Sequence, residues 1–266
     1  MKAKINQLTI ISESNYALGR FYEGIFHLRP TETKSPTEDV SIGDGHIGLS
    51  IKPRLSGHPA QLDSFGIEVD DIELALARIR ESYPKTMFQE GSGNGSRATV
   101  SAHDPDGNVF ILSQADMKAR DEGGRQKPVR FIDHIALRVL HPKEVAEFYA
   151  KVFDLAPLDK PSQQKNYYLS DGHATLVIIP WTLSDFEGTG ISARGMDHIG
   201  FKVESIAALK SDIDRVAAKN YRFQPNASIV GKGKEGAVRL AMFRRTCPLG
   251  CHHMADSDGL LLDVSE

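Results

Sequence analysis

The stretch 18-LGRFYEGIFHL-28 has a counterpart 127 positions further along the chain, 145-VAEFYAKVFDL-155. The same offset holds without a gap from Gln7 to Ile51, and it places the turn 44-DGH-46 on 171-DGH-173. An internal repeat of this length predicts that two similar structural units follow each other in one chain.

The repeat continues beyond this region with longer offsets. The segment 65-FGIEV-69 matches 199-IGFKV-203 at an offset of 134, and 104-DPDGNVFILSQ-114 matches 256-DSDGLLLDVSE-266. We therefore predict an N-terminal domain over 1–115, a linker over 116–129 and a C-terminal domain over 130–266. The linker assignment rests on a charged segment that contains Gly-Gly and Pro and lacks hydrophobic periodicity.

Hydrophobic periodicity subdivides each half again. Apolar residues that alternate predict strands, and those that recur at helical spacing predict helices. In the first half the predicted order is strand 5–11, helix 15–26, short strands ending at 47–51, strand 64–69, helix 71–82 and a closing strand 109–113. In the second half it is strand 131–139, helix 142–153, strands to 179, strand 197–203, helix 205–219 and strands to 265. This pattern indicates an α+β fold of four βαβββ modules paired into two domains, each an open barrel-like mixed sheet flanked by helices around a concave space.

Three positions distinguish the two copies. Gln7, Ser64 and Ile111 of the first copy become His134, His198 and Asp263 of the second. Strand alternation puts Ile135, Leu137 and Val139 on the helix side of their strand and His134 on the concave side. The same alternation puts His198 and Asp263 on the concave side of their own strands. Two imidazoles and one carboxylate are typical ligands of Fe(II) and other divalent ions, so we predict a metal site in the second domain only.

The motifs FYxxxF on the first helix, DGH before a strand and DPDG before the closing strand resemble those of the vicinal oxygen chelate superfamily. This superfamily includes glyoxalase I, extradiol dioxygenases, methylmalonyl-CoA epimerase and bleomycin-resistance proteins. Four modules in two domains, with metal ligands only in the second, are most similar to the two-domain extradiol dioxygenases. The resemblance implies an Fe(II)-dependent ring-cleavage dioxygenase that acts on a catechol-like aromatic or other vicinal-oxygen substrate with O2, although Mn(II) or Zn(II) is also compatible with the ligands.

The chain departs from this family at several positions. The family usually has glutamate where this chain has Asp263. Glyoxalase-type members have a fourth ligand, a glutamate on the strand that corresponds to 174-ATLVIIPW-181, which carries no carboxylate. Asp185 and Glu187 fall in the loop that follows. Three protein ligands leave coordination positions for a bidentate substrate and a small molecule, which favours an oxygenase-type site.

Candidate catalytic residues come from the same resemblance. Extradiol enzymes have a tyrosine ten residues before the carboxylate ligand, and His253 stands at that position here as a general acid or base. The family's other catalytic histidine would fall at Leu183. His173 is a candidate substitute, although its counterpart His46 favours a role in the turn, and Tyr168 is a candidate for contact with the substrate.

Two other functions stay open on sequence alone. A metal-assisted isomerase, epimerase or lyase would use the metal as a Lewis acid and His253 or Glu266 as base. A non-catalytic small-molecule binder of the resistance type would need aromatic-lined cavities, and the chain has one tryptophan, Trp181. Cys247 and Cys251 match a structural zinc site poorly. The segment 230-VGKGKEG-236 is predicted to be a mobile loop over the cavity, where Lys232 and Lys234 could meet an anionic substrate.

Composition limits the class of protein. The net charge of −3 gives no sign of nucleic-acid binding. No apolar run approaches the roughly 18 residues of a membrane span, and the N-terminus lacks signal-peptide features. Two cysteines fit a reduced, cytoplasmic protein. Homo-oligomers are common in the superfamily, and the sequence does not fix the assembly.

Overall fold

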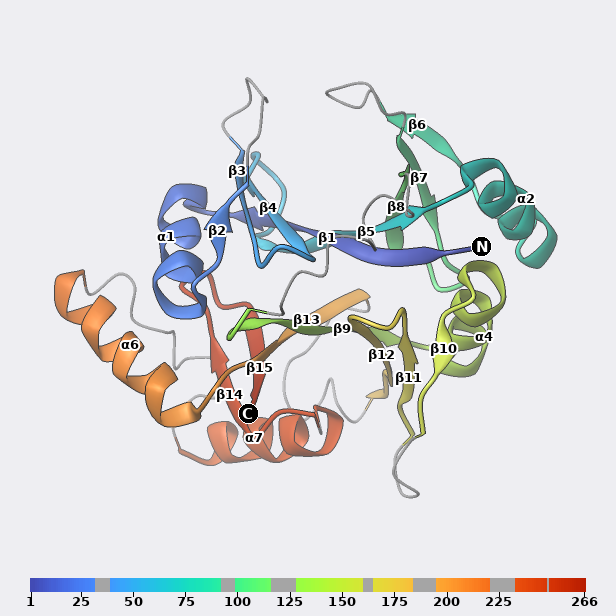
Figure 1. Ribbon diagram of the computed structural model, residues 1–266. Helices are drawn as coiled ribbons and strands as arrows, with labels where there is room; N and C mark the ends of the chain where they lie inside the picture. The colour runs from blue at the N-terminus through green and yellow to red at the C-terminus, as the bar shows by residue number, and fades with distance from the viewer. Residues whose placement is uncertain are drawn as a thin grey trace.

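The computed structural model describes residues 1–31, 39–91, 99–115, 128–159, 165–183, 195–220, 233–247 and 249–266, so most of the predicted linker lies outside the described residues. Within these residues the chain forms two mixed sheets, one from each half (Figure 1). Helices flank both sheets, and the α+β fold predicted from the repeat is confirmed.

The first sheet has eight strands, in the spatial order β2 (Arg29–Pro30), β3 (Val40–Gly43), β4 (Gly48–Pro53), β1 (Ala3–Ser12), β5 (Gln61–Val69), β8 (Val109–Gln114), β7 (Thr99–His103) and β6 (Gln89–Gly91). The second has seven, in the order β10 (Ala156–Pro157), β11 (Tyr167–Ser170), β12 (Thr175–Pro180), β9 (Phe131–Val139), β13 (Gly195–Lys202), β15 (Leu261–Ser265) and β14 (His252–Ala255). The described helices are α1 (Asn15–Phe26), α2 (Ile72–Ser82), α4 (Pro142–Phe153), α6 (Ile206–Lys219) and α7 (Gly233–Thr246).

The strand register reproduces the sequence repeat. Gln7 of β1 lies opposite Gly66 of β5, which in turn lies opposite Ile111 of β8. In the second sheet Gly200 of β13 occupies the corresponding place between His134 of β9 and Asp263 of β15. The offsets read from the sequence therefore match equivalent positions in space.

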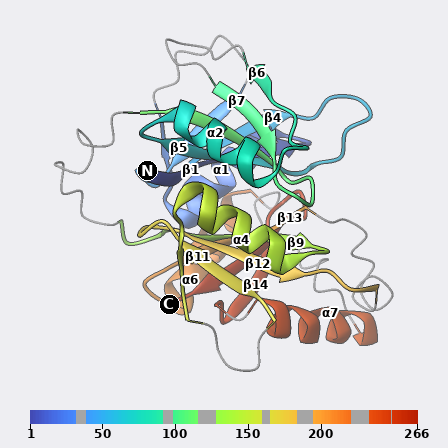
Figure 2. The same ribbon diagram turned by 90° about the vertical axis from the view of Figure 1, so that its right-hand side faces the viewer.

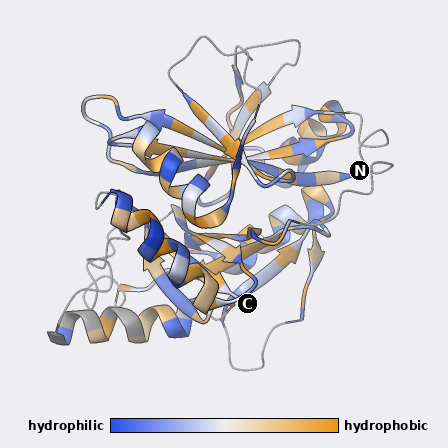
Figure 3. Ribbon diagram, turned by 60° about the vertical axis from the view of Figure 1, so that its left-hand side comes forward, coloured by the Kyte–Doolittle hydropathy of each residue, from blue (hydrophilic) through white to orange (hydrophobic). Residues whose placement is uncertain are grey.

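The two halves share one hydrophobic core. Side chains from one face of each sheet and from α1, α2 and α4 belong to a single buried cluster. Between the halves, α1 packs against α6, and α2 packs against α4, as Figure 2 shows for the second pair. We call the sheet face that contributes to this cluster the core face and the opposite one the outer face. Figure 3 shows hydrophobic residues in orange along the stacked strands and the helices beside them.

The repeated motifs tie the halves together in matched pairs. The Tyr22 hydroxyl of α1 donates to Asp256 at 2.9 Å, and the Tyr149 hydroxyl of α4 donates to Asp104 at 3.1 Å. Each bond joins the FY motif of one half to the DxDG turn of the other. The turns 44-DGH-46 and 171-DGH-173 are also paired across the halves. Asp44 accepts a hydrogen bond from the backbone N–H of Ile132, and Asp171 accepts one from that of Ile5.

One predicted element is corrected. The prediction of a mobile loop over 230–236, followed by strands, is wrong from residue 233, where α7 begins; residues 230–232, including Lys232, lie outside the described part of the chain. The reason is a weak local signal, since Gly233 and Gly236 both lower helix propensity. None of the helices in the described residues combines the length and hydrophobicity needed to cross a bilayer.

Candidate metal centre

Three adjacent strands bring the predicted ligands together. Alternation along β9 puts Ile135, Leu137 and Val139 in the shared core, and Ala136 in a separate cluster on the outer face. His134 lies on this outer face with Ala136. In β15, Leu262 is on the core face, which leaves Asp263 on the outer face. The division of these two strands into a core face and an outer face thus follows the alternation expected from the sequence.

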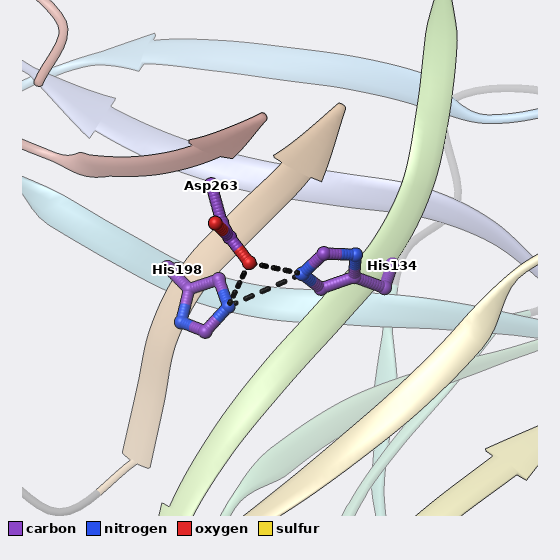
Figure 4. A group of neighbouring side chains, drawn as sticks. All are labelled: His134, His198 and Asp263. Carbon is purple, nitrogen blue, oxygen red and sulfur yellow. Dashed lines mark hydrogen bonds and ion pairs between the residues drawn. The ribbon is translucent and has the colours of Figure 1, made fainter. Parts of the chain in front are cut away.

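Three potential ligand atoms converge at this point (Figure 4). The Nε2 atoms of His134 and His198 are 3.2 Å apart, and Oδ2 of Asp263 lies 3.3 Å from the first and 3.9 Å from the second. Ligands that bind one ion at about 2.1 Å and at right angles to each other would be separated by about 3.0 Å. The spacing of the three atoms therefore fits a single divalent cation.

Two glycines provide the space that the ligands occupy. A Cβ added to Gly200 would lie 1.9 Å from Cε1 of His134, and one added to Gly250 would lie 1.7 Å from Oδ1 of Asp263. The backbone N–H of Gly250 also donates to Oδ2 of Asp263 at 3.0 Å. Both positions exclude a side chain for steric reasons, because the ligand side chain fills the place of the missing Cβ.

A carboxylate precedes each histidine and orients its ring. Nδ1 of His198 lies 2.7 Å from Oδ2 of Asp197, and Nδ1 of His134 lies 3.2 Å from Oδ2 of Asp133. A carboxylate can only accept, so in the neutral form of each ring Nδ1 carries the proton and Nε2 presents a lone pair to the cluster. Carboxylate–histidine pairs of this kind are typical of metal ligands. Arg138 in turn donates to Asp197 at 2.6 Å.

The electrostatics of the cluster favour a cation. Burial acts to raise the pKa of Asp263, but close contacts with the imidazoles of His134 and His253 hold it well below its usual range. Burial likewise opposes ionisation of Asp197, whereas the charge of Arg138 and the His198 hydrogen bond keep its pKa far below normal. Burial also lowers the pKa of His198, which favours the neutral imidazole that a metal requires.

The imidazole of His134 behaves differently. Burial acts to lower its pKa, but the hydrogen bonds to Asp133 and Asp263 outweigh burial and raise it. Without a cation, a proton on His134 offsets the charge of Asp263. A divalent cation would take the place of this proton, because a ligating imidazole must be deprotonated at the coordinating nitrogen.

Two buried polar atoms at the cluster have no hydrogen-bond partner among the described residues. They are Oδ1 of Asp263 and Nε2 of His253, which lie 3.1 Å apart in an ion-pair contact without hydrogen-bond alignment. Buried polar atoms left in this state in a native protein call for an explanation such as an ion or a ligand. The donor set and these two atoms together fit a bound metal ion.

The candidate catalytic residues differ in their position relative to the proposed metal ligands. His253 lies opposite Asp263 in the sheet, beside the cluster, whereas His252 lies opposite Val264. Tyr168 belongs to the outer-face cluster with Ala136, and its hydroxyl accepts from Asn166 at 3.3 Å. Burial raises the pKa of Tyr168, and the negative charge of Asp263 adds to this effect.

His173 is not brought to the cluster. Its exposed ring stacks on His46 at a centroid distance of 5.0 Å, in the contact between the halves. Leu183, at the position of the family's second histidine, is 60% exposed. Glu266 accepts a hydrogen bond from the backbone N–H of Ile206, at the start of α6. Asp185 and Glu187 lie outside the described residues.

Sequence reasoning missed residues that surround the ligands. Asp133 and Asp197 had a visible signal, since both histidines stand in Asp-His dipeptides, 133-DH-134 and 197-DH-198. Cys247 had none: its buried Sγ lies 3.6 Å from Nδ1 of His198. Cys251 is exposed, and no metal-ligand group in the described part of the chain contains it.

Comparison with known proteins agrees with this architecture. Residues 131–262 match the family model described as Glyoxalase/Bleomycin resistance protein/Dioxygenase superfamily. The half of the chain that carries the cluster therefore belongs to this superfamily, as the sequence motifs predicted. No curated protein is significantly similar to the chain.

Solved structures share the whole fold at low sequence identity. The Mn(II)-bound glyoxalase from Novosphingobium aromaticivorans is 16% identical, with a TM-score of 0.62, over 98% of this chain and 81% of that chain. The 2,2',3-trihydroxybiphenyl 1,2-dioxygenase from Sphingomonas wittichii is 12% identical, with a TM-score of 0.61, over 99% and 90%. The 2,3-dioxygenase LapB from a Pseudomonas species is 17% identical, with a TM-score of 0.60, over 99% and 91%. At these identities the similarity shows the fold alone.

Proposed function

We propose that this protein is a metal-dependent, extradiol-type ring-cleavage dioxygenase that uses Fe(II) and acts on a catechol-like aromatic. The observation that carries the proposal is the convergence of two imidazole nitrogens and one carboxylate oxygen on the outer face of the second sheet. Two histidines and one carboxylate with open coordination positions are typical of Fe(II) oxygenases. Superfamily membership and the dioxygenase neighbours support the same choice.

His134, His198 and Asp263 would hold the metal. When bound, Fe(II) would supply the one-electron chemistry that lets an aromatic diol react with O2. Asp133 and Asp197 would keep both histidines in the tautomer that presents Nε2, through their contacts with the Nδ1 atoms at 3.2 and 2.7 Å.

His253 would handle a proton. Its Nε2 is positioned 3.1 Å from Oδ1 of Asp263, within reach of a substrate that lies beside the carboxylate. In this proposal Nε2 accepts a proton from a substrate hydroxyl, and Asp263 stabilises the resulting imidazolium. Tyr168 would contact the substrate from β11 on the same outer face.

The shorter carboxylate does not prevent this assignment. Asp263 has one methylene fewer than the usual glutamate, but its Oδ2 already lies 3.3 Å from Nε2 of His134. Gly250 makes this approach feasible, because any side chain there would collide with the Asp263 carboxylate. The N-terminal sheet has Gln7, Ser64 and Ile111 at the equivalent places, and we assign it a structural role.

Metal content tests the ligand assignment. The protein is reconstituted anaerobically with Fe(II), desalted and analysed for metal. We expect about one ion per chain in the wild type and in Gln7→Ala, and loss of the ion in His134→Ala and His198→Ala, because each removes one of three ligands. Gln7 is the matched control, since it occupies the position of His134 in the other half. Equal metal in all three variants would refute the ligand set.

Oxygen uptake tests the reaction class. Metal-loaded protein is assayed against a panel of catechols and hydroquinones with an oxygen electrode. Uptake that depends on both metal and substrate is expected. Absence of uptake with every metal-loaded sample would sink the dioxygenase proposal, and turnover without oxygen would favour the isomerase or lyase chemistry that the ligand set also permits.

A further inference from the structure

Among the described residues, helix α7 has no counterpart in the first half of the chain. Between 65-FGIEV-69 and 104-DPDG-107 the first half is shorter than the second, since the offset grows from 134 to 152, a difference of 18 residues. The 14 residues of α7 lie inside this longer segment. Figure 1 shows α7 beyond the second sheet, on the side away from the first.

This helix packs over the metal cluster. Met242 and Phe243 of α7 form a small buried cluster with Cys247 and with Leu261 of β15, which lies two residues before Asp263 on the same face. Cys247, just after the helix, contacts Nδ1 of His198 at 3.6 Å. The outer face of the sheet is thus covered at the ligands themselves.

Phe243 occupies a defined place beside the proposed proton-transfer residue. Its ring stacks on the imidazole of His253 with a centroid distance of 6.1 Å and an interplanar angle of 24°. The Nε2 edge of the same imidazole lies 3.1 Å from Oδ1 of Asp263. A planar aromatic substrate bound next to Asp263 could make the same stack on His253, so Phe243 and such a ring compete for one position.

The covered site is closed to a substrate of this size. The side chains of His134, His198 and Asp263 are each exposed by 1% or less. In contrast, few buried side chains hold α7 against the sheet. Of the α7 side chains that the structure describes, Met242 and Phe243 are buried and the others are exposed, including Val238 at 48%. Elements with few buried apolar contacts open at low free energy.

We propose that α7 is a movable cover of the metal centre and that Phe243 holds the place of the substrate's aromatic ring until the substrate displaces it. The proposal rests on the proposed function and narrows its substrate to planar aromatic rings that can replace the phenyl group against His253. An aliphatic vicinal-oxygen compound would not recover the stacking lost when Phe243 withdraws.

The rate at which Cys247 reacts with a thiol reagent measures the opening of α7 without any metal. The chain has two cysteines, so a Cys251→Ser background leaves the buried Cys247 as the sole reporter. In this background we expect Phe243→Ala to accelerate labelling by Ellman's reagent on the order of tenfold. Val238→Ala, on the exposed side of the same helix, serves as the matched control and should stay within about twofold of the parent.

Circular dichroism and thermal unfolding establish that each variant is folded, and Phe243→Leu, which keeps most of the apolar contact, should give an intermediate rate. On the Fe(II)-loaded protein, 4-nitrocatechol should bind more tightly to Phe243→Ala than to Val238→Ala, because no ring has to be displaced. Equal labelling rates in Phe243→Ala and Val238→Ala would overturn the proposal that α7 is a movable cover held by Phe243. This result is independent of metal content and oxygen uptake, which alone decide the proposed function.

Discussion

At the two glycines beside the ligands, the absence of a side chain is the functional feature. Glycine normally weakens a strand because it contributes no packing. At Gly200 of β13 that loss is offset, because His134 fills the space that a Cβ would take, and Gly250, just before β14, leaves the same room for Asp263. The ligand geometry therefore depends on residues that carry no chemistry of their own.

We predict that Gly200→Ala impairs metal binding. The added methyl would fall 1.9 Å from the His134 ring, so the ring must swing away from Asp263. Retention of metal after desalting should fall by at least about tenfold, as for losses of groups that orient ligands. Gly48→Ala is the control, since the nearest atom to its new methyl is 3.8 Å away. Equal retention in the two variants would contradict the steric argument.

At the level of elements, helices of one half support strands of the other. Phe26 of α1 stacks on Phe201 of β13 with ring centroids 3.8 Å apart, and both rings are fully buried. Phe201 shares β13 with His198, so the first half of the chain supports the strand that carries a ligand. This contact gives the metal-free half a physical role in the site.

Phe26→Ala should therefore destabilise the whole protein. Removal of a buried phenylalanine ring typically costs about 3–5 kcal/mol, from lost transfer free energy and the cavity left behind. Urea unfolding measures this loss. Tyr16→Ala on the same helix, where the side chain is 65% exposed, should change the free energy of unfolding by no more than about 0.5 kcal/mol. An equally small effect of Phe26→Ala on the free energy of unfolding would mean that the contact between Phe26 and Phe201 is dispensable for stability.

On the scale of the whole molecule, matched polar ties join the halves around a common core. Asp256 receives the Tyr22 hydroxyl from the other half and the backbone N–H groups of Asp258 and Leu260. Burial raises the pKa of Asp256 to about 7, although the hydrogen bonds from Leu260 and Tyr22 act to lower it. The tie is therefore sensitive to pH.

The pH dependence has a definite sign. The folded pKa of Asp256 lies above its ordinary value of 3.8, so the folded protein binds more protons than the unfolded chain between about pH 4 and pH 7. The free energy of unfolding should fall as pH rises through this window, by at most about 4 kcal/mol from this group. Asp256→Asn should lack this part of the slope, whereas the exposed Glu90→Gln should retain it. Urea unfolding at a series of pH values measures the slope of the free energy of unfolding against pH. Identical slopes in the two variants would contradict the assignment of this pH dependence to Asp256.

Much of the fold was determined by the sequence alone. Gap-free repetition fixed equivalent positions, and alternation along β9 fixed which face each side chain occupies, because successive residues of a strand point to opposite faces. The proposed ligands His134, His198 and Asp263 could be named in this way, since they replace Gln7, Ser64 and Ile111 at equivalent positions.

The tertiary structure decided what local patterns do not encode. The pairing of Tyr22 with Asp256 joins residues 234 positions apart, and no periodicity reveals such a contact. The stacking of His173 on His46 likewise depends on how the halves meet. Helix α7 carries two glycines and a weak hydrophobic pattern, so its position over the ligands follows from the packing of Met242 and Phe243 on the sheet rather than from its own sequence.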